Sequence, residues 1–267
     1  MQRRVSFPVF FDLWAQVKGW HVPDFHYAIC DWLQKRDRVA VLEVFRGASK
    51  STIVAVYIAW RLYADPKRRF LIQAADDDTA VKMSRDVREV LRRHPLTLNL
   101  MSRKSAEHMF WVNGSDDERN PSVSARGVLS NVTGSRADEI IFDDCEVPKN
   151  IQSIELREKL RARMSDATYI LVPGGQILYI GTPHTFDSIY EEKAADGAER
   201  LMMPLFRHNQ RIENAVRLPD MPLEIPRKDL MVFHGKKALL RKTDWFVEDG
   251  DVVFTKSLTG TVDVYSD

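Results

Sequence analysis

A chain of 267 residues, 44% of them hydrophobic and 29% charged, has room for one large α/β domain, alone or with a small appendage, which excludes a peptide hormone or a disulfide knot. Because 39 Lys and Arg residues balance 38 Asp and Glu residues, binding to nucleic acid would need a local basic patch. The two cysteines, Cys30 and Cys145, lie far apart and are expected to be free thiols in a reducing compartment. The longest apolar run, around residues 53–60, is about half of the roughly 18 residues that a membrane span needs, and residues 1–16 do not form a signal-peptide core.

The first half of the chain alternates between strand and helix patterns. Residues 39–45 are β-branched and apolar, which predicts a strand, and residues 50–65 predict a helix that stops before Pro66. Residues 69–75 predict the next strand, and the acidic stretch after it predicts the N-cap of a helix over residues 76–93. This alternation indicates βα units.

The pattern continues through two further apolar runs, residues 140–142 and 176–180, with a helix predicted between them at 153–164. Strands that alternate with helices predict an α/β fold with a mostly parallel central sheet flanked by helices. Residues 101–133 break the rhythm and predict a hairpin insertion. We therefore expect one domain over residues 1–190, followed by a proline-rich lid or linker subdomain over residues 191–267.

The loop after the first strand, Arg46-Gly47-Ala48-Ser49-Lys50-Ser51-Thr52, is the most informative segment. It matches the end of the G-x-x-x-x-G-K-[ST] phosphate loop, in which backbone N–H groups and a helix N-terminus hold phosphate, the lysine neutralises it and the hydroxyl reaches Mg²⁺. Val44 and Ser49 stand where that pattern has glycines, and the position of Ser49 normally takes a positive φ. Alone, the loop is also compatible with a solvated first helical turn.

Three carboxylates follow a later apolar strand, in Asp143-Asp144-Cys145-Glu146. Such a cluster is costly when unpaired, and a bound divalent cation is the simplest compensation, although a solvated acidic turn is the alternative. In open parallel sheets ligands bind at the carboxyl ends of the strands, so the loops that carry Lys50, Asp143 and Thr182 are expected to meet there. The sequence thus predicts an ATP and Mg²⁺ site in which Asp143 holds the metal and a neighbouring carboxylate polarises the attacking water.

Three ordered segments, residues 45–52, 134–146 and 177–185, resemble the large terminase subunit of tailed bacteriophages, most strongly its T7-like branch. The likeness covers roughly residues 20–190. It implies a P-loop ATPase domain of the RecA/ASCE type that drives DNA into a procapsid, followed in that family by an RNase H-like nuclease. We expect this chain to be the motor domain without the nuclease.

The resemblance implies a role for each matching residue. Lys50 becomes the phosphate lysine, Ser51 the Mg²⁺ hydroxyl and Arg46 the γ-phosphate sensor, within an ATP-binding loop that spans residues 46–52. Asp143 becomes the metal carboxylate. The activating carboxylate usually follows it directly as Glu, but here that place holds Asp144, with Glu146 two residues on, so Asp144 is favoured and Glu146 stays an alternative.

Two further catalytic residues are expected from the same resemblance. Thr182, in Gly181-Thr182-Pro183, is similar to the motif that couples hydrolysis to movement, with a plain turn as the alternative. A ring motor also needs a cation from the neighbouring subunit, for which Arg136 is the first candidate, and Arg126, Arg157 and Arg161 are weaker ones.

Binding surfaces are less sharply marked. The aromatic segment 21–32 is a candidate for the adenine, although rings at this spacing are also typical of a core. Residues 82–104 hold seven basic side chains against two acidic ones and could track DNA phosphates, as could a second cluster within residues 157–163; a solvated helix face is the alternative.

The resulting hypothesis is an ATP-hydrolysing, Mg²⁺-dependent motor that translocates double-stranded DNA without regard to sequence, as part of a homo-oligomeric ring. The resemblance implies the phage portal protein and the small terminase subunit as partners, no membrane, and a place in the cytoplasm of the infected bacterium, transiently at the procapsid. The alternatives are a superfamily 2 helicase-like ATPase and a nucleotide-gated module that docks DNA with little turnover.

Overall fold

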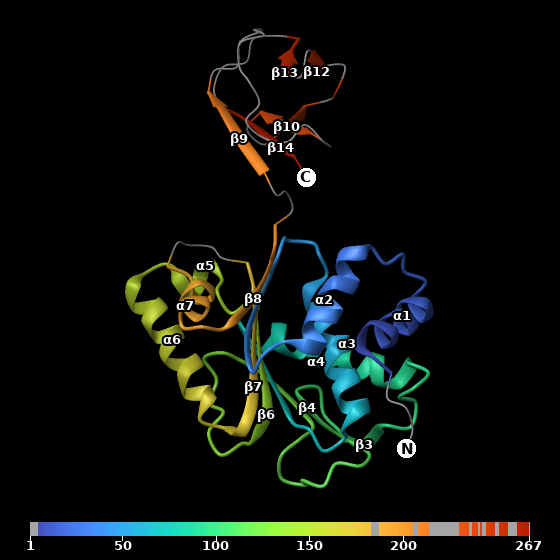
Figure 1. The fold of residues 1–267 in the computed structure, drawn as a ribbon. Coiled ribbons are helices and arrows are strands. Elements are labelled where there is room, and N and C mark those ends of the chain that lie inside the picture. The colour runs from blue at the N-terminus through green and yellow to red at the C-terminus, as the bar shows by residue number, and fades with distance from the viewer. Residues whose placement is uncertain are drawn as a thin grey trace. The chain divides into compact units, whose positions relative to one another are not determined.

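The computed structural model describes residues 5–182, 187–204, 208–213, 230–234, 237–239, 241, 244–248, 251–255 and 261–266. The chain divides into two compact units, Met1–Met203 and Pro204–Asp267 (Figure 1). The first unit extends past the expected boundary at residue 190, because β8 (Glu199–Met203) pairs in parallel with β1 (Val39–Val44) and so belongs to the same sheet. Within the described residues, no helix is both long and apolar enough to cross a membrane.

The first unit is built on one eight-stranded sheet with the strand order β3-β4-β5-β2-β6-β7-β1-β8. The six strands from β5 to β8 in this order run parallel, whereas β4 is antiparallel to both of its neighbours. This confirms the predicted α/β fold with a mostly parallel sheet, and the hairpin excursion forms one edge of that sheet. The remaining strands are β2 (Phe70–Ala74), β3 (Met101–Ser105), β4 (Met109–Val112), β5 (Val123–Gly127), β6 (Ala137–Asp143) and β7 (Leu171–Gly181).

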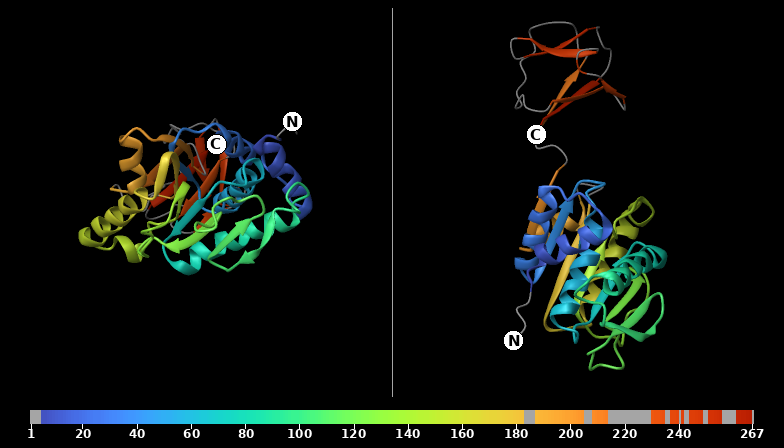
Figure 2. Two further views of the ribbon diagram at one scale, coloured as in Figure 1. Left: turned by 90° about the horizontal axis from the view of Figure 1, so that it is seen from below. Right: turned by 90° about the vertical axis from the view of Figure 1, so that its right-hand side faces the viewer.

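Helices cover both faces of this sheet (Figures 1 and 2). One face carries α1 (Phe7–Lys18), α2 (Asp24–Lys35), α3 (Lys50–Ala64) and α4 (Asp77–Arg93), and the other carries α5 (Pro148–Ile151), α6 (Ile154–Thr168) and α7 (Ile189–Ala195). Successive residues of a strand point to opposite faces, so Leu42 packs into the first layer while Val41 packs into the second. Strands that are buried on both faces therefore read as continuous apolar runs.

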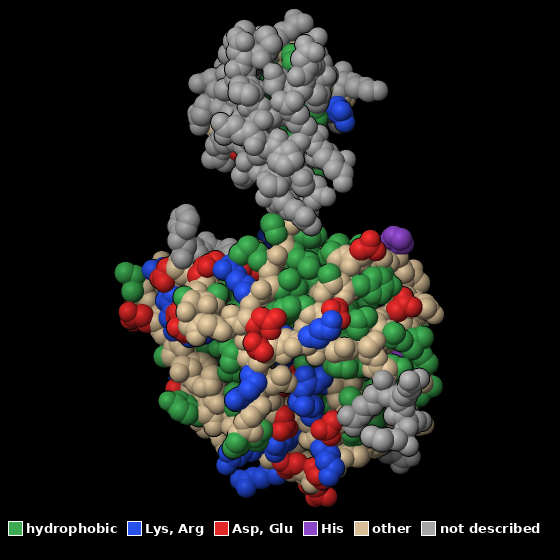
Figure 3. Space-filling model, viewed as in Figure 1, with side chains coloured by type: hydrophobic (Ala, Val, Ile, Leu, Met, Phe, Trp, Pro, Cys, Tyr) green, Lys and Arg blue, Asp and Glu red, His purple; other side chains and the backbone are tan. Residues whose placement is uncertain are grey.

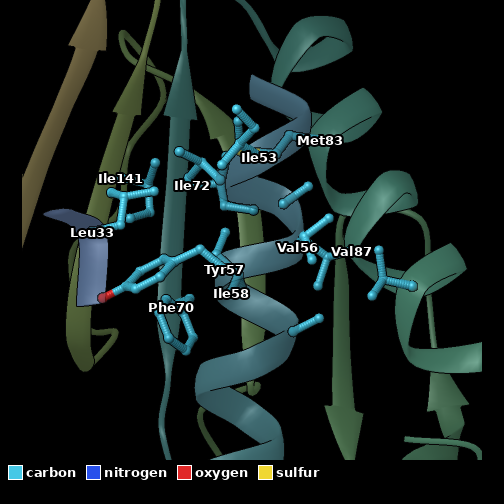
Figure 4. Close-up of a cluster of buried hydrophobic side chains, with 14 of the residues drawn as sticks. Leu33, Ile53, Val56, Tyr57, Ile58, Phe70, Ile72, Met83, Val87 and Ile141 are labelled. Atoms are coloured by element: carbon cyan, nitrogen blue, oxygen red, sulfur yellow. The ribbon is translucent and has the colours of Figure 1, made fainter. Parts of the chain in front are cut away.

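The larger core lies between the sheet and α3. This helix is apolar nearly all round because β2 packs on one side of it and α4 on the other, as Figure 4 shows for Tyr57, Ile72 and Val87. The ends of α4 and α6 follow the sequence signals, since Asp76 and Ser153 each accept a hydrogen bond from a backbone N–H in the first turn.

The second unit is a small β structure. Four strands form an antiparallel sheet in the order β11-β10-β14-β9, and β12 forms an antiparallel pair with β13. Trp245 and Phe254 from the hairpin are buried in one cluster with Val262 and Val264. The strands are β9 (His208–Glu213), β10 (Met231–His234), β11 (Lys237–Leu239), β12 (Trp245–Glu248), β13 (Asp251–Phe254) and β14 (Thr261–Ser266). Its role as a lid or linker stays a prediction.

A buried ion cluster joins α2, α3 and β6. The Glu139 carboxylate is fully buried and pairs with the guanidinium of Arg36, which is itself 1% exposed. Tyr57 donates a hydrogen bond to Glu139 at 3.1 Å, and Arg61 lies 3.5 Å from its second oxygen. Buried charges persist only when they are paired and hydrogen-bonded, so these residues hold one another in place.

We expect Glu139→Ala to lower the free energy of unfolding by roughly 3–5 kcal/mol, because it leaves the buried Arg36 without its counter-charge. Urea unfolding followed by circular dichroism measures this change. Glu158→Ala, at an exposed position of α6, is the matched control and should change the free energy by less than about 0.5 kcal/mol. Equal stability of the two variants would contradict the structural role of the cluster.

Candidate active site

The loop between β1 and α3 has a left-handed residue at the position where the phosphate-loop pattern has a glycine. Gly47 has φ 91° and Ser49 has φ 59°, so Ser49 adopts the left-handed conformation at the position where the pattern has glycine. A left-handed conformation costs an L-residue about 1–2 kcal/mol, which the packed helix start directly after it must offset. The side chain of Lys50 is largely buried at this helix start, whereas Arg46 is exposed.

The structure brings the two motifs that the sequence singled out into direct contact. Ser51 Oγ donates a hydrogen bond of 3.0 Å to Asp143 Oδ1, across 92 residues of sequence. Lys50 Nζ lies 3.3 Å from Asp144 Oδ2. In the sheet β7 lies between β1 and β6, so these side chains meet beyond the carboxyl end of β7. The ammonium, the hydroxyl and the two adjacent carboxylates therefore form one site at the predicted edge of the sheet.

Asp143 is the more buried of the two carboxylates. Burial raises its pKa to about 7, and the neighbouring Asp144 adds to this, while the hydrogen bond from Ser51 and the charge of Lys50 oppose it. A carboxylate in such a place gains most from a cation, and a hydroxyl beside a carboxylate is a donor pair that suits Mg²⁺. Among the described residues, no group of three or more His, Cys, Asp and Glu side chains forms a complete metal cage.

The next two carboxylates face different ways. Asp144 has φ 44°, and its side chain is 42% exposed and lies beside Lys50. Its backbone N–H donates to the Ile180 carbonyl at 2.9 Å, which fixes the loop against the end of β7. Glu146 is 3% exposed, and its Oε1 accepts a hydrogen bond of 2.7 Å from the backbone N–H of Ile189 in α7. Asp144 therefore lies open to solvent beside Lys50, and Glu146 is held at a neighbouring helix.

Comparisons with known proteins bear on this site. A stretch of 157 residues, 57% of the chain, is 32% identical to the protein named "Terminase, large subunit" of Enterobacteria phage T3. The chain is similar to terminase large subunits. The match spans 27% of the length of the T3 protein, and no protein-family profile matches the chain.

Two solved structures are similar to parts of this chain. A structure of S. cerevisiae Dbp5 bound to Gle1 and IP6 has a TM-score of 0.50, with 14% identity over 73% of this chain and 50% of that one. The large terminase ATPase domain of Thermus phage P74-26 has a TM-score of 0.42, with 20% identity over 68% of this chain and 72% of that one. The Dbp5 likeness agrees with the α/β fold described above.

The terminase resemblance also predicts a role for Thr182, which directly follows β7. Thr182 is partly buried, and the strand before it ends beside the acidic loop, because Asp144 binds the Ile180 carbonyl. The loop of Thr182 thus starts at the edge of the sheet where Lys50 and Asp144 meet. Pro183, the last residue of the predicted turn, lies outside the described residues.

A cavity of about 510 Å³ lies next to the phosphate loop on the side of α1 and α2. His21 and His26 from the predicted adenine segment line it, and His26 Nε2 lies 3.2 Å from the Ala48 carbonyl. Other aromatic residues of the segment serve the structure: Tyr27 donates to Asp12, and Phe25 packs against Phe45. The full lining is Phe11, Gly19, Trp20, His21, Val22, His26, Ser49, Thr52 and Ile53.

Arg136 lies directly before β6, at the end of the sheet opposite to the phosphate loop. It is exposed and lines a cavity of about 700 Å³ together with Arg119 and Arg163. At this position it is far along β6 from the Asp143 of its own chain. Arg157 and Arg161, by contrast, pair with Asp187 on the side of α7.

The predicted basic surfaces are partly neutralised. On α4, Arg85 pairs with Glu107 at 2.8 Å and Arg93 pairs with Glu89 at 2.6 Å. Acidic and basic side chains are interspersed over the face of the first unit that Figure 3 shows. Ser84, Val87 and Leu91 are buried, as the helical pattern predicts. The side chains of Arg103 and Lys104 lie outside the described ones.

Sequence reasoning missed the residues that support this site. Trp20 and Phe11 line the cavity, and Tyr190 packs against the end of β7, but none of them belongs to a recognisable motif. The pattern Ser188-Ile189-Tyr190-Glu191 is a helix-start signal, since Ser188 Oγ accepts from the Glu191 N–H at 3.2 Å. That signal could have predicted α7, although not its partners.

We expect Asp143→Asn to stabilise the metal-free chain above about pH 7. The Asp143 carboxyl has a pKa of about 7 in the folded chain and near 3.8 when unfolded, so its ionisation opposes folding increasingly as the pH rises from about 4 to 7. The gain approaches roughly 4 kcal/mol at high pH as an upper bound and vanishes below pH 4. Thermal unfolding in EDTA between pH 4 and 8 measures it. A stability difference that does not change with pH would contradict the burial of this charge.

Proposed function

We propose that this chain is the ATP-hydrolysing motor domain of a viral DNA-packaging terminase. The proposal rests on the contact of Ser51 with Asp143 and of Lys50 with Asp144 at the carboxyl edge of a parallel sheet. A lysine, a hydroxyl and an acidic pair in this arrangement are what nucleoside triphosphate hydrolysis needs. The similarity to the phage T3 terminase large subunit, at 32% identity over 157 residues, supports it.

Each residue of the site has its own role in binding or hydrolysing ATP. The backbone N–H groups of residues 46–52 and the N-terminus of α3 bind the phosphates, and Lys50 neutralises their charge. Ser51 and Asp143 hold Mg²⁺, which when bound draws charge from the phosphates and aligns them. Asp144 accepts a proton from the attacking water and orients it, and Arg46 reports on the γ-phosphate. The cavity lined by His21 and His26 takes the nucleoside.

The partners follow from the terminase similarity. The motor acts on double-stranded DNA without reading its sequence, in a ring of identical subunits that docks on the portal protein and works with the small terminase subunit. Contacts to phosphates alone make affinity fall steeply with salt. The basic side chains of α4 form one surface for this contact. The basic side chains of residues 157–163 form the other.

We expect Lys50→Ala and Asp144→Asn each to lower ATP turnover by about 10²- to 10³-fold, because the first removes phosphate neutralisation and the second removes the activating carboxylate. Steady-state phosphate release with and without DNA measures this effect. Lys35→Ala, at an exposed position of α2, is the control and should keep full activity.

Other outcomes of this assay separate the alternatives. A motor turns over ATP faster when DNA is present. A DNA-docking module binds ATP and DNA but releases almost no phosphate in either condition, which would overturn the proposal. Full activity of Asp144→Asn would remove Asp144 from the role of activating carboxylate. A helicase-like ATPase would instead separate the strands of a short duplex, which a packaging motor leaves paired.

We further expect Arg136 to act on the nucleotide of the neighbouring subunit. Arg136→Ala subunits and Lys50→Ala subunits should each be inactive alone. A mixture should recover part of the turnover, because an intact site in one subunit then receives an intact arginine from the next. Phosphate release is measured after light scattering has shown that the subunits are assembled. Normal hydrolysis by assemblies of Arg136→Ala alone would contradict this role.

A further inference from the structure

The first turn of α7 contacts the ends of the strands that surround the candidate active site. Glu146, which follows β6, accepts a hydrogen bond from the Ile189 N–H at 2.7 Å. This contact turns its carboxylate away from Lys50 and buries it at the start of the helix. The acidic loop is therefore fixed at one end by Glu146, three residues after the metal carboxylate.

The next residue of the helix contacts the end of β7. Tyr190 is 1% exposed, and its hydroxyl donates to the Ile180 carbonyl at 3.3 Å. The same carbonyl accepts the backbone N–H of Asp144 at 2.9 Å. One oxygen atom thus joins the activating carboxylate's backbone to α7. Gly181 is required for this packing, because a Cβ at that position would lie 2.0 Å from the Tyr190 hydroxyl oxygen.

The third residue of α7, Glu191, is linked to β8 and, through β8, to β1. Glu191 pairs with Arg200 of β8 at 2.9 Å. Arg200 Nε also donates to Glu43 at 2.6 Å. Glu43 lies in β1, three residues before Arg46, and is 3% exposed. The first three residues of α7 therefore contact the acidic loop after β6, the end of β7 and Arg200 of β8, and Arg200 in turn binds Glu43 of β1.

We propose that Glu146 is a positioning residue that, with Tyr190, holds the acidic loop in register with the end of β7 through the first turn of α7. Its carboxylate acts on the Ile189 N–H, and it does not touch the attacking water. The inference deepens the proposed function and rests on it. Because Glu146 ties the acidic loop to α7 two residues after Asp144, loss of its bond to Ile189 lets the Asp144 carboxylate move from its place beside Lys50 without removing any group that binds phosphate.

The conservative variant distinguishes positioning from catalysis. Glu146→Gln keeps an amide oxygen that accepts from Ile189 but cannot act as a base, whereas Glu146→Ala loses the bond. We expect Glu146→Ala to lower kcat at least tenfold while KM for ATP changes less than threefold. Glu146→Gln should keep kcat within about threefold of the unchanged chain. Glu158→Ala is the control for loss of an exposed acid from the same unit.

Two results would overturn this role. If Glu146→Gln lowers ATP turnover as much as Asp144→Asn does, Glu146 is the base itself. If Glu146→Ala leaves kcat unchanged, the bond to Ile189 positions nothing. Tyr190→Phe gives a second, milder variant that keeps the buried ring, and it should lower kcat a few-fold at constant KM. Unchanged kcat in Tyr190→Phe would remove Tyr190 from the proposal.

A measurement without nucleotide separates this inference from the proposed function. Hydrogen exchange at the Ile189 amide should speed up at least tenfold in Glu146→Ala and stay slow in Glu146→Gln. Exchange that is unaffected in Glu146→Ala would contradict the proposed anchor, whatever the chain does with ATP. If the wild-type chain binds ATP and releases no phosphate, the proposed function is refuted. The exchange result still decides whether Glu146 holds α7.

Discussion

The site depends on contact between the loop after β1 and the loop after β6, two strands that are separated in the sheet by β7. Lys50 and Ser51 follow β1, Asp143 and Asp144 follow or end β6, and β7 lies between them. All three strands are parallel, so their carboxyl ends share one edge, and the side chains meet just beyond the end of β7. The free energy for holding an ammonium and two carboxylates together comes from the buried strands below, because exposed ion pairs contribute little by themselves.

Burial gives the neighbouring carboxylates different properties. Asp143 is shielded and has a raised pKa, so it gains from a bound cation, whereas Asp144 is open to solvent and faces the lysine. Glu146 is also buried, and its pKa is raised by that burial, while the Ile189 N–H and the charge of Arg161 oppose the rise. The three acidic side chains of residues 143–146 thus lie in three different environments. The left-handed backbone at Asp144 turns the chain sharply, so that they point in different directions.

Part of this arrangement could be read from the sequence because its signals are local. The helix that starts at Lys50 and ends before Pro66, and the caps at Asp76 and Ser153, follow from residue type and spacing alone. The positive φ at Ser49 was likewise expected from the position of a missing glycine. The boundary at residue 190 was misplaced because β8 is short, and its membership of the sheet depends on pairing with β1, more than 150 residues earlier in the chain.

The sequence by itself determined the βα alternation from β1 to β7, the candidate phosphate loop and the acidic cluster, because periodicity, caps and motifs are properties of neighbouring residues. Only the tertiary structure decided which carboxylate faces Lys50, which of the aromatic residues line a cavity, and that Glu146 and Tyr190 join α7 to the acidic loop and to the end of β7. These outcomes depend on strand order and on which face a side chain occupies. Both are set by pairing between segments distant in the chain, and no local pattern records them.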